Sequence, residues 1–265
     1  MPSYNRLLIA SAKGGVGKST TAIGLAAAYA RMGKRVLLCD LDCTSRSLDL
    51  LLGCGGAVFD FADFARGMDA SQAAFAGAGE MDNLSLIPAC TVLRLEEAAA
   101  EKGTDVPALL RDAVRRLLSS GYDAVICDTG AGIGYAEACA DLFEMVLVTS
   151  GQSQTSIRAA EYAAVCFKEA GAKLLRLVIC AFDLSAVKRE HRAGMIEMID
   201  ASSMQCAGVV PRDASLQKKQ DAGVLPDKKS VCMKAYENLA RRLQGEEIPL
   251  FTGMGRLYRK RAAAL

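Results

Sequence analysis

Short, continuously apolar runs alternate with segments of helical spacing along most of the chain. Between the runs, apolar positions recur at helical spacing, most clearly over 18–32, 106–118 and 153–170. This alternation predicts parallel strands joined by right-handed crossovers, and strands without polar alternation predict a sheet covered on both faces. The expected fold is α/β, with a mostly parallel twisted sheet and helices on both faces. The expected strands are 6–11, 35–40, 84–88, 123–128, 145–149, 174–180 and 207–210.

The chain shows no internal repeat and no low-complexity linker, and its segments are joined by short turns. One domain over residues 1–245 is therefore the simplest organisation. From Glu246 onward the composition changes, so residues 246–265 are interpreted as a C-terminal tail.

The composition of the chain argues against several classes of protein. The 265 residues are 51% hydrophobic and 23% charged, with a net charge of +2, which argues against a strongly basic nucleic-acid-binding protein and against an acidic disordered one. The ten cysteines form no C-x-x-C pair and His191 is the single histidine, so we expect reduced core thiols and no zinc finger. No signal peptide and no run of about 18 apolar residues is evident, so a cytoplasmic protein is expected.

A glycine-rich turn between the first expected strand and the first expected helix is the strongest chemical signal. This strand–turn–helix context is the one that a phosphate-binding loop requires. Gly14, Gly15 and Gly17 let backbone N–H groups approach a phosphate, and the following helix adds the positive end of its dipole. We expect Lys18 to reach the β- and γ-phosphates of a nucleotide, and Ser19 to bind Mg²⁺. The loop comprises Lys13, Gly14, Gly15, Val16, Gly17, Lys18, Ser19 and Thr20.

Acidic residues follow two of the expected strands. Asp40 and Asp42 lie on the same side at the end of strand 35–40, because side chains alternate along a strand. Ligands of open α/β sheets bind outside the carboxyl ends of the strands, so both carboxylates should face the phosphates. Asp128 ends strand 123–128 in the arrangement of a Walker B motif, and we expect it to bind Mg²⁺ through water.

The sequence of this loop resembles the deviant phosphate loop of the MinD/ParA ATPase family. Ala12 stands where the generic loop has glycine, and Lys13 precedes the double glycine. The stretch 45–53 is similar to the MinD branch in particular, and the resemblance covers nearly the whole chain. It implies a single-domain P-loop NTPase fold, ATP and Mg²⁺ as cofactors, and slow hydrolysis of ATP to ADP and phosphate.

The resemblance also implies roles for individual residues. Lys13 would reach the nucleotide of a partner chain, so that ATP brings two chains together. Asp42 would position the attacking water, with Asp40 nearer the metal. Main chain near Pro211 and Asp213 would contact adenine.

Two positions depart from the family pattern. Cys180 lies in the stretch where an asparagine usually reads the base, which leaves the recognition of adenine open. Gly130 replaces the usual proline after the Walker B strand, which predicts a more flexible segment there.

The tail carries a basic amphipathic pattern over residues 250–261. On a helix, one face would carry Phe251, Met254, Leu257 and Tyr258, and the opposite face basic residues. Such a segment suits an anionic membrane surface, as in MinD proteins, although glycines at 253 and 255 disfavour a helix. The basic residues opposite the apolar face are Arg256, Arg259 and Lys260.

Taken with these patterns, the resemblance implies a MinD-like ATPase that dimerises on ATP, associates with the inner face of the cell membrane and recruits division or positioning proteins. Hydrolysis, speeded by an activating partner, would release it. Three alternatives stay open. A ParA-like ATPase would bind DNA through lysines such as Lys218 and Lys219, an adaptor would sense nucleotide with little turnover, and an iron–sulfur carrier would use Cys127 and Cys139.

Overall fold

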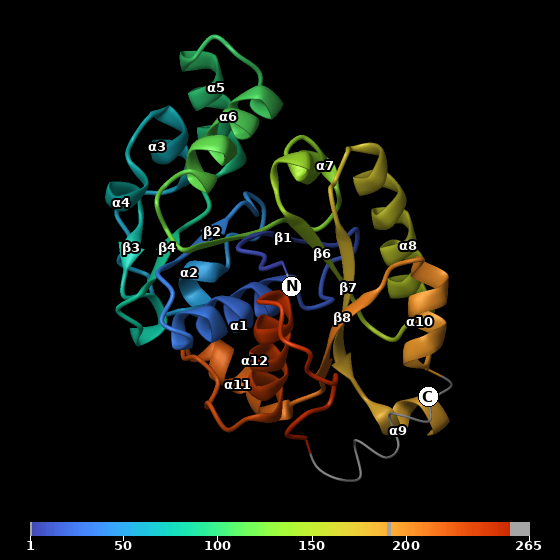
Figure 1. Cartoon of the computed structure of the whole chain (residues 1–265). Helices are drawn as coiled ribbons and strands as arrows, with labels where there is room; N and C mark the ends of the chain where they lie inside the picture. The colour runs from blue at the N-terminus through green and yellow to red at the C-terminus, as the bar shows by residue number, and fades with distance from the viewer. Residues whose placement is uncertain (1, 190–191, 255–265) are drawn as a thin grey trace.

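The apolar runs of the chain pair into one sheet in the computed structural model, which describes residues 2–189 and 192–254 (Figure 1). Within this described part the sheet has eight strands, in the order β3-β4-β2-β5-β1-β6-β7-β8. Every pair is parallel except β3 with β4. The strands are β1 (Arg6–Ala10), β2 (Val36–Asp40), β3 (Phe75–Ala76), β4 (Leu84–Ile87), β5 (Ala124–Asp128), β6 (Met145–Ser150), β7 (Leu175–Phe182) and β8 (Cys206–Pro211).

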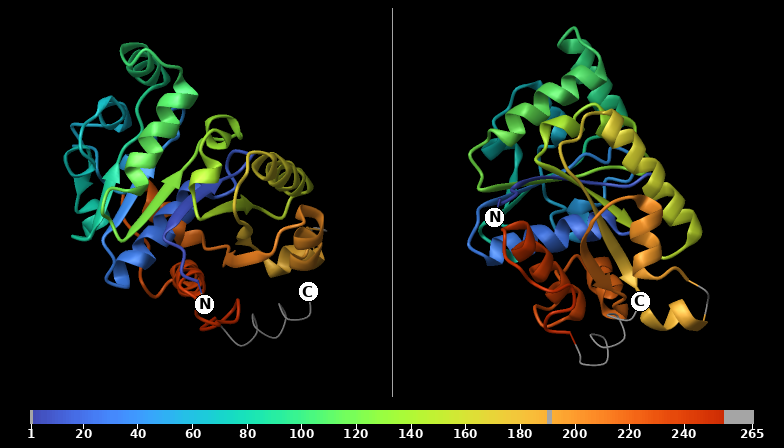
Figure 2. Two further views of the ribbon diagram at one scale, coloured as in Figure 1. Left: turned by 45° about the horizontal axis from the view of Figure 1, so that its top comes forward. Right: turned by 45° about the vertical axis from the view of Figure 1, so that its right-hand side comes forward.

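Helices cover both faces of the sheet (Figure 2). One layer contains α1, α11 and α12, and the other contains α5, α6 and α8. The α-helices are α1 (Lys18–Arg31), α2 (Leu48–Leu51), α3 (Phe61–Arg66), α4 (Ala70–Ala73), α5 (Val92–Glu101), α6 (Val106–Leu118), α7 (Gly134–Glu137), α8 (Gln154–Glu169), α9 (Leu184–Arg189), α10 (Met195–Ser202), α11 (Ala214–Asp221) and α12 (Val231–Leu243), and the 3₁₀ turns are η1 (Ala78–Glu80) and η2 (Ala140–Leu142).

The expected fold class is confirmed. All seven expected strands are present with ends shifted by a residue or two, and the helices expected over 18–32, 106–118 and 153–170 are α1, α6 and α8. The two-residue strand β3 was not expected, because so short an edge strand leaves no hydrophobic run to recognise.

Helix α1 is buried between the sheet and α12, and this close packing depends on a glycine. A Cβ atom at Gly24 would lie 2.2 Å from the Tyr236 ring on α12, which is far inside van der Waals contact. Gly24 therefore allows α1, which follows directly after the phosphate loop, to lie close to α12.

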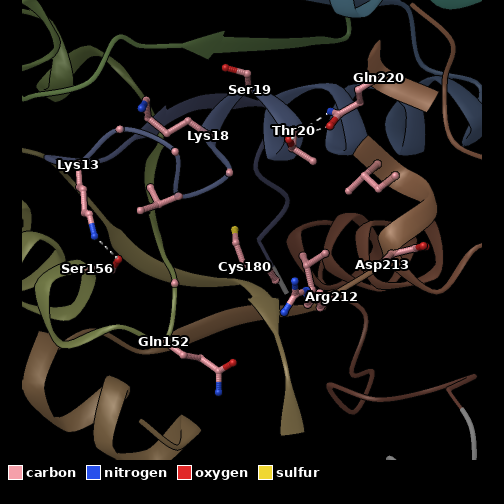
Figure 3. Close-up of a pocket in the computed structure, with 18 of the residues that line it drawn as sticks. Lys13, Lys18, Ser19, Thr20, Gln152, Ser156, Cys180, Arg212, Asp213 and Gln220 are labelled. Carbon is pink, nitrogen blue, oxygen red and sulfur yellow. Dashed lines mark hydrogen bonds between the residues drawn. The ribbon is translucent and has the colours of Figure 1, made fainter. Parts of the chain in front are cut away.

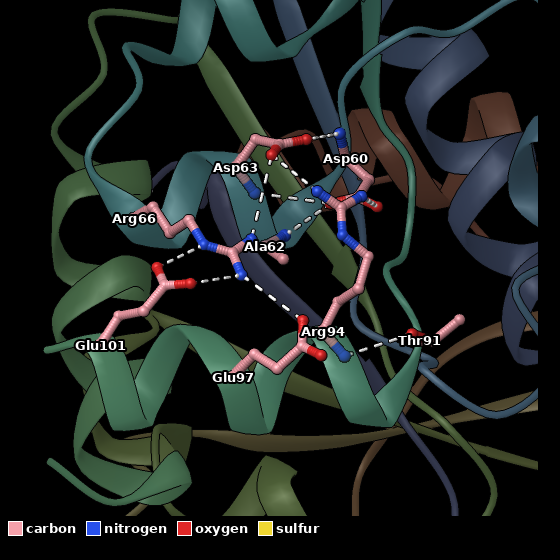
Figure 4. Close-up of polar contacts among 8 residues, drawn as sticks. All are labelled: Asp60, Ala62, Asp63, Arg66, Thr91, Arg94, Glu97 and Glu101. Carbon is pink, nitrogen blue, oxygen red and sulfur yellow. Dashed lines mark hydrogen bonds and ion pairs between the residues drawn. The ribbon is translucent and has the colours of Figure 1, made fainter.

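A polar network joins α3 to α5 beside the sheet (Figure 4). Asp60 and Asp63 form a capping box at the start of α3. Arg94 on α5 donates hydrogen bonds to both carboxylates. The network continues through Arg66 to Glu97 and Glu101. Because these groups are partly exposed, solvent screens each ion pair and its contribution to stability is small.

The described part of the tail packs on α12. Phe251 and Met254 are 9% and 4% exposed and belong to the hydrophobic core. The expected helix does not begin in this segment, because Gly253 has φ of 76° and the chain forms turns there. Residues 255–261 of the expected amphipathic segment lie outside the described residues. In the part of the chain that the structure describes, no helix is both long and apolar enough to cross a membrane.

Candidate functional site

The turn between β1 and α1 forms an open cradle of backbone N–H groups. Gly15 and Gly17 have φ of 72° and 98°, in the left-handed region that glycine adopts without strain. A Cβ atom at Gly17 would also lie 3.1 Å from Cys180 Cβ, so the loop has no room for a side chain there. No side chain caps the start of α1, so its first N–H groups are available to an anion.

A cavity of about 970 Å³ opens over this turn (Figure 3). It is lined by the whole segment from Lys13 to Thr20, and also by Cys180, Pro211 and Asp213. The structure therefore brings the expected phosphate-binding and base-contacting residues to one cavity. Its size suits a nucleotide, since small-molecule sites span about 300–1,000 Å³.

The three expected acidic residues gather at one edge of the sheet. Asp40 and Asp128 are register partners at the ends of the neighbouring strands β2 and β5, and are 1% and 0% exposed. The carboxyl oxygens of Asp40 accept hydrogen bonds from the N–H groups of Asp42 and Leu48, at 2.9 and 3.1 Å. Burial raises the pKa of Asp40 to about 6, although these two hydrogen bonds lower it.

Asp128 has the electrostatics of a cation ligand. Both of its oxygens are buried without a hydrogen-bond partner among the described residues. Burial raises the pKa of Asp128 well above its ordinary value and Asp40 raises it further, whereas the Ser19 hydroxyl and the Lys18 ammonium lower it. A buried carboxylate without a partner is costly. The carboxylate of Asp128 and the nearby Ser19 hydroxyl therefore fit a hard divalent cation such as Mg²⁺.

Asp42 lines the cavity over the phosphate loop and also a second, smaller cavity bordered by residues 129–136. It is 6% exposed, and its Oδ1 accepts N–H groups from Thr44 and Ser45, both at 3.0 Å. A Cβ atom at Gly130 would lie 3.0 Å from the same oxygen. The absence of a side chain at Gly130 therefore provides the space that the Asp42 carboxylate occupies. The greater flexibility expected of this segment stays a prediction.

The Lys13 side chain is held by the N-terminus of α8 (Figure 3). Its Nζ lies 2.7 Å from Thr155 Oγ1, 3.1 Å from Ser156 Oγ and 3.4 Å from Ser153 Oγ. These hydroxyls were not anticipated from the sequence. Their signal was their position directly after the strand that pairs with β1, where polar side chains face the loop.

Two glutamines that line the cavity were also not anticipated from the sequence. Gln152 fixes the segment after β7, because its Oε1 accepts the Asp183 N–H at 2.7 Å and its Nε2 donates to Ala193 O at 3.1 Å. Gln220 on α11 donates to Thr20 Oγ1 at 3.1 Å, so the last residue of the phosphate loop is tied to α11. Neither contact has a signal in the local sequence.

The cavity is also lined by a thiol, that of Cys180, which lies against Gly17 of the phosphate loop. Cys180 is 4% exposed, and its Sγ lies 3.4 Å from Thr21 Oγ1. Burial raises the pKa of Cys180 to about 11. At this position β7 is irregular, and Ala181 has φ of 50°. The Cys180 thiol is therefore neutral at physiological pH.

Comparisons with known proteins agree with this geometry. Residues 7–226 match the family described as the CobQ/CobB/MinD/ParA nucleotide binding domain. The septum site-determining protein MinD of Synechocystis sp. is 30% identical over 257 residues, covering 94% of this chain and 93% of its own length.

Two solved structures extend this likeness. The MinC:MinD cell division protein complex of Aquifex aeolicus contains a chain with a TM-score of 0.80 at 27% identity, covering 92% of this chain and 97% of its own length. MinD of Pyrococcus horikoshii, complexed with Mg-ADP, shares the fold with a TM-score of 0.76 at 21% identity, covering 89% and 94%. The resemblance noted in the phosphate loop is thus confirmed over almost the whole sequence, and the chain belongs to the CobQ/CobB/MinD/ParA family of nucleotide-binding domains with a MinD-like P-loop NTPase fold.

Proposed function

We propose that this protein is a MinD-like ATPase that binds Mg·ATP in the cavity over the β1–α1 turn. One observation carries the proposal: the uncapped start of α1, the buried Lys18 and the partnerless carboxylate of Asp128 meet at one edge of the sheet. A cradle for phosphate and a ligand for a cation are therefore adjacent. The Mg-ADP complex of the Pyrococcus horikoshii relative agrees with this pairing.

Different residues of the phosphate loop would contact the phosphates and the magnesium ion. Backbone N–H groups over 14–17 would hold the phosphates, while Lys18 and Thr20 would contact phosphate oxygens. Ser19 and Asp128 would hold Mg²⁺. The negative charge of the neighbouring Asp40 carboxylate would further favour the cation. Bound Mg²⁺ would neutralise charge on the phosphate oxygens during transfer.

Base binding is proposed for the part of the cavity that Pro211 and Asp213 line. Main chain at Pro211 and Asp213 would contact adenine, since Oδ1 of Asp213 already accepts hydrogen bonds from the N–H and the hydroxyl of Ser215. Cys180 has a thiol where a base-reading amide is usual. We propose that main-chain contacts carry most of the base recognition.

Hydrolysis is assigned to Asp42. One of its oxygens is fixed by two backbone N–H groups, and the other accepts no hydrogen bond within the described residues. The second oxygen would orient the attacking water against the γ-phosphate. Turnover would be slow until a partner completes the site.

Lys13 is proposed to couple ATP to dimerisation. In the single chain its ammonium contacts three hydroxyls at the start of α8, those of Ser153, Thr155 and Ser156. To reach the nucleotide of a second chain it must exchange these contacts for phosphate. Since a charged phosphate is a stronger acceptor than a hydroxyl, this exchange is favourable only when ATP is bound opposite.

Membrane attachment and division-site selection complete the proposal. Residues 250–261 would bind an anionic membrane at the inner face of the cell membrane, which requires Phe251 and Met254 to leave the core. Two tails on one dimer would bind far more tightly than one. The Aquifex aeolicus complex with MinC makes division proteins the class of partner that we propose.

Light scattering of the purified chain with ADP or ATP tests this function. Asp42→Ala should trap the ATP-bound state, so ATP should double the mass of the variant while ADP leaves it unchanged. A mass that never changes with ATP would contradict ATP-dependent dimerisation.

Flotation with anionic liposomes and gel shift with DNA, at the same salt, separate a MinD-like from a ParA-like role.

Phosphate release distinguishes an ATPase from a nucleotide-sensing adaptor. The wild type should release phosphate slowly, and Asp42→Ala should release at least about tenfold less. Equal rates in both proteins would remove Asp42 from its assigned role.

A further inference from the structure

Two thiols meet beside the loop that carries Asp42. Strands β2 and β4 are parallel neighbours, with Cys39 opposite Ile87, so the segments that leave their carboxyl ends run side by side. Cys43 lies on the first segment, directly after Asp42, and Cys90 lies on the second. Their Sγ atoms are 3.9 Å apart. The fold therefore brings together two cysteines that are far apart in the sequence.

One of the two cysteines borders a cavity that a small oxidant can enter. Cys43 is 9% exposed and lines a cavity of about 210 Å³, together with Asp42 and the segment 129–136. Cys90 is completely buried behind it. A molecule the size of water or hydrogen peroxide fits such a space. The pair thus has one cysteine that borders a cavity and one that is enclosed.

The surroundings of the two thiols shift their pKa values in opposite directions. The pKa of Cys43 is lowered chiefly by the hydrogen bond from Cys90, against burial and the charges of Asp40, Asp42 and Asp60. The pKa of Cys90 is raised by the same hydrogen bond and by burial. Because the thiolate is the reactive form, Cys43 is the nucleophile of the pair and Cys90 its resolving partner.

The other cysteines lack this combination. All ten are described and free. Cys39 and Cys127 are opposite each other on β2 and β5, but both are 0% exposed, so an oxidant in the solvent cannot reach either sulfur. Cys206 is the most exposed of the ten, at the edge of the sheet on β8. It serves as a control.

We propose that Cys43 and Cys90 are an oxidation site, at which a peroxide forms a disulfide that fixes the loop carrying Asp42. The Cys43 thiolate attacks one peroxide oxygen, the O–O bond breaks, and the leaving oxygen takes up a proton to give Cys43 sulfenic acid and water. The Cys90 sulfur then attacks the Cys43 sulfur, its proton passes to the departing hydroxide, and a second water leaves. Two thiols are oxidised and one peroxide is reduced to two waters.

The disulfide would change the geometry around Asp42. A disulfide bond is about 2.05 Å long, so the two sulfurs, now 3.9 Å apart, must approach by roughly 1.9 Å. The backbone around Cys43 also holds Asp42 Oδ1, through the N–H groups of Thr44 and Ser45. A shift of this segment therefore displaces the carboxylate. This consequence rests on the proposed ATPase function, whereas formation of the bond does not.

Mass spectrometry after peroxide treatment tests the bond itself. The native chain is treated with hydrogen peroxide, alkylated and digested without reductant. We expect a linkage between the tryptic peptides 36–46 and 67–94, with fragment ions that place it on Cys43 and not Cys39. Cys43→Ser and Cys90→Ala should lose the linkage, while Cys206→Ser should keep it. Absence of the linked peptide in the wild type would overturn the proposal.

Two readouts test the conformational effect. Phosphate release should fall at least about tenfold on oxidation and return with dithiothreitol, in the wild type and Cys206→Ser but not in Cys43→Ser. Tryptic cleavage of the folded chain after the exposed Arg46 should slow about threefold or more. A linked protein with unchanged cleavage would overturn the switch. If the reduced chain releases no phosphate, the ATPase function fails while the linkage and cleavage still decide this proposal.

Discussion

At the scale of single residues, the distinctive feature of the site is a pair of buried carboxyl groups with no positively charged partner that forms an ion pair with them in the described residues. Asp128 has no hydrogen-bond partner among the described residues, and it lies next to Asp40, which is also buried. Such an arrangement costs stability in the free protein and becomes favourable when a cation arrives. Stability and binding should therefore respond in opposite directions to the same substitution.

Asp128→Asn is expected to stabilise the metal-free protein and to abolish magnesium-dependent nucleotide binding. Because the folded pKa of Asp128 is raised above 3.8, its ionisation costs native stability increasingly as the pH rises above that value. At pH 8 the variant should gain about 1–3 kcal/mol in urea unfolding with EDTA, and the gain should shrink towards pH 4. A variant that is less stable than the wild type at pH 8 would contradict this.

Gly130→Ala tests the space that Asp42 occupies. The added methyl would approach Asp42 Oδ1 to 3.0 Å and push the carboxylate away. Phosphate release should fall roughly tenfold while nucleotide affinity stays within about twofold, because misplacement of a positioning group affects the chemical step. Gly134→Ala is the control, since a Cβ there meets nothing within 4 Å. Equal activity of the two variants would count against the role of Asp42.

At the scale of elements, the start of α8 holds Lys13 in the single chain. Thr155→Val combined with Ser156→Ala removes two of its three hydroxyl partners. We expect the double variant to dimerise at about fivefold lower ATP concentration, because Lys13 leaves fewer hydrogen bonds behind. Light scattering measures this midpoint, and Ser119→Ala, at the end of α6, is the control. An unchanged midpoint would show that these hydroxyls do not hold Lys13 back.

The packing of α1 on α12 gives a prediction about stability. Gly24→Ala should lower the free energy of unfolding by about 2 kcal/mol or more, because the new methyl overlaps the Tyr236 ring. Gly56→Ala, where a Cβ meets nothing within 4 Å, should change it by only a few tenths. Urea denaturation of both variants checks the difference. Similar values for the two would mean that α12 adjusts freely.

At the scale of the whole molecule, much of the sheet could be predicted from the sequence. Strands such as Val36–Asp40 are apolar runs that end in a carboxylate, so one pattern gives both the strand and its place at the ligand edge. The contacts of Lys13 with Ser156 could not be predicted, because the two residues are far apart in the sequence and meet only through the pairing of β1 with β6.

The tail is a case in which the local pattern does not determine where the side chains pack in the single chain. Phe251 and Met254 fit the apolar face of a helix, yet in the structure they fill the core beside α12. The pattern of apolar residues does not say which surface they cover. Tertiary packing decided it, with Gly253 providing the turn that allows it.

The central claim is that the β1–α1 turn binds the phosphates of a magnesium nucleotide. Calorimetric titration of nucleotide-stripped protein with Mg·ATP tests it directly, with Lys18→Ala as the matched variant. We expect saturable binding of one nucleotide per chain in the wild type, and affinity at least about tenfold weaker in Lys18→Ala. Absence of binding to the wild type at millimolar nucleotide, or equal affinity in the two proteins, would contradict the account.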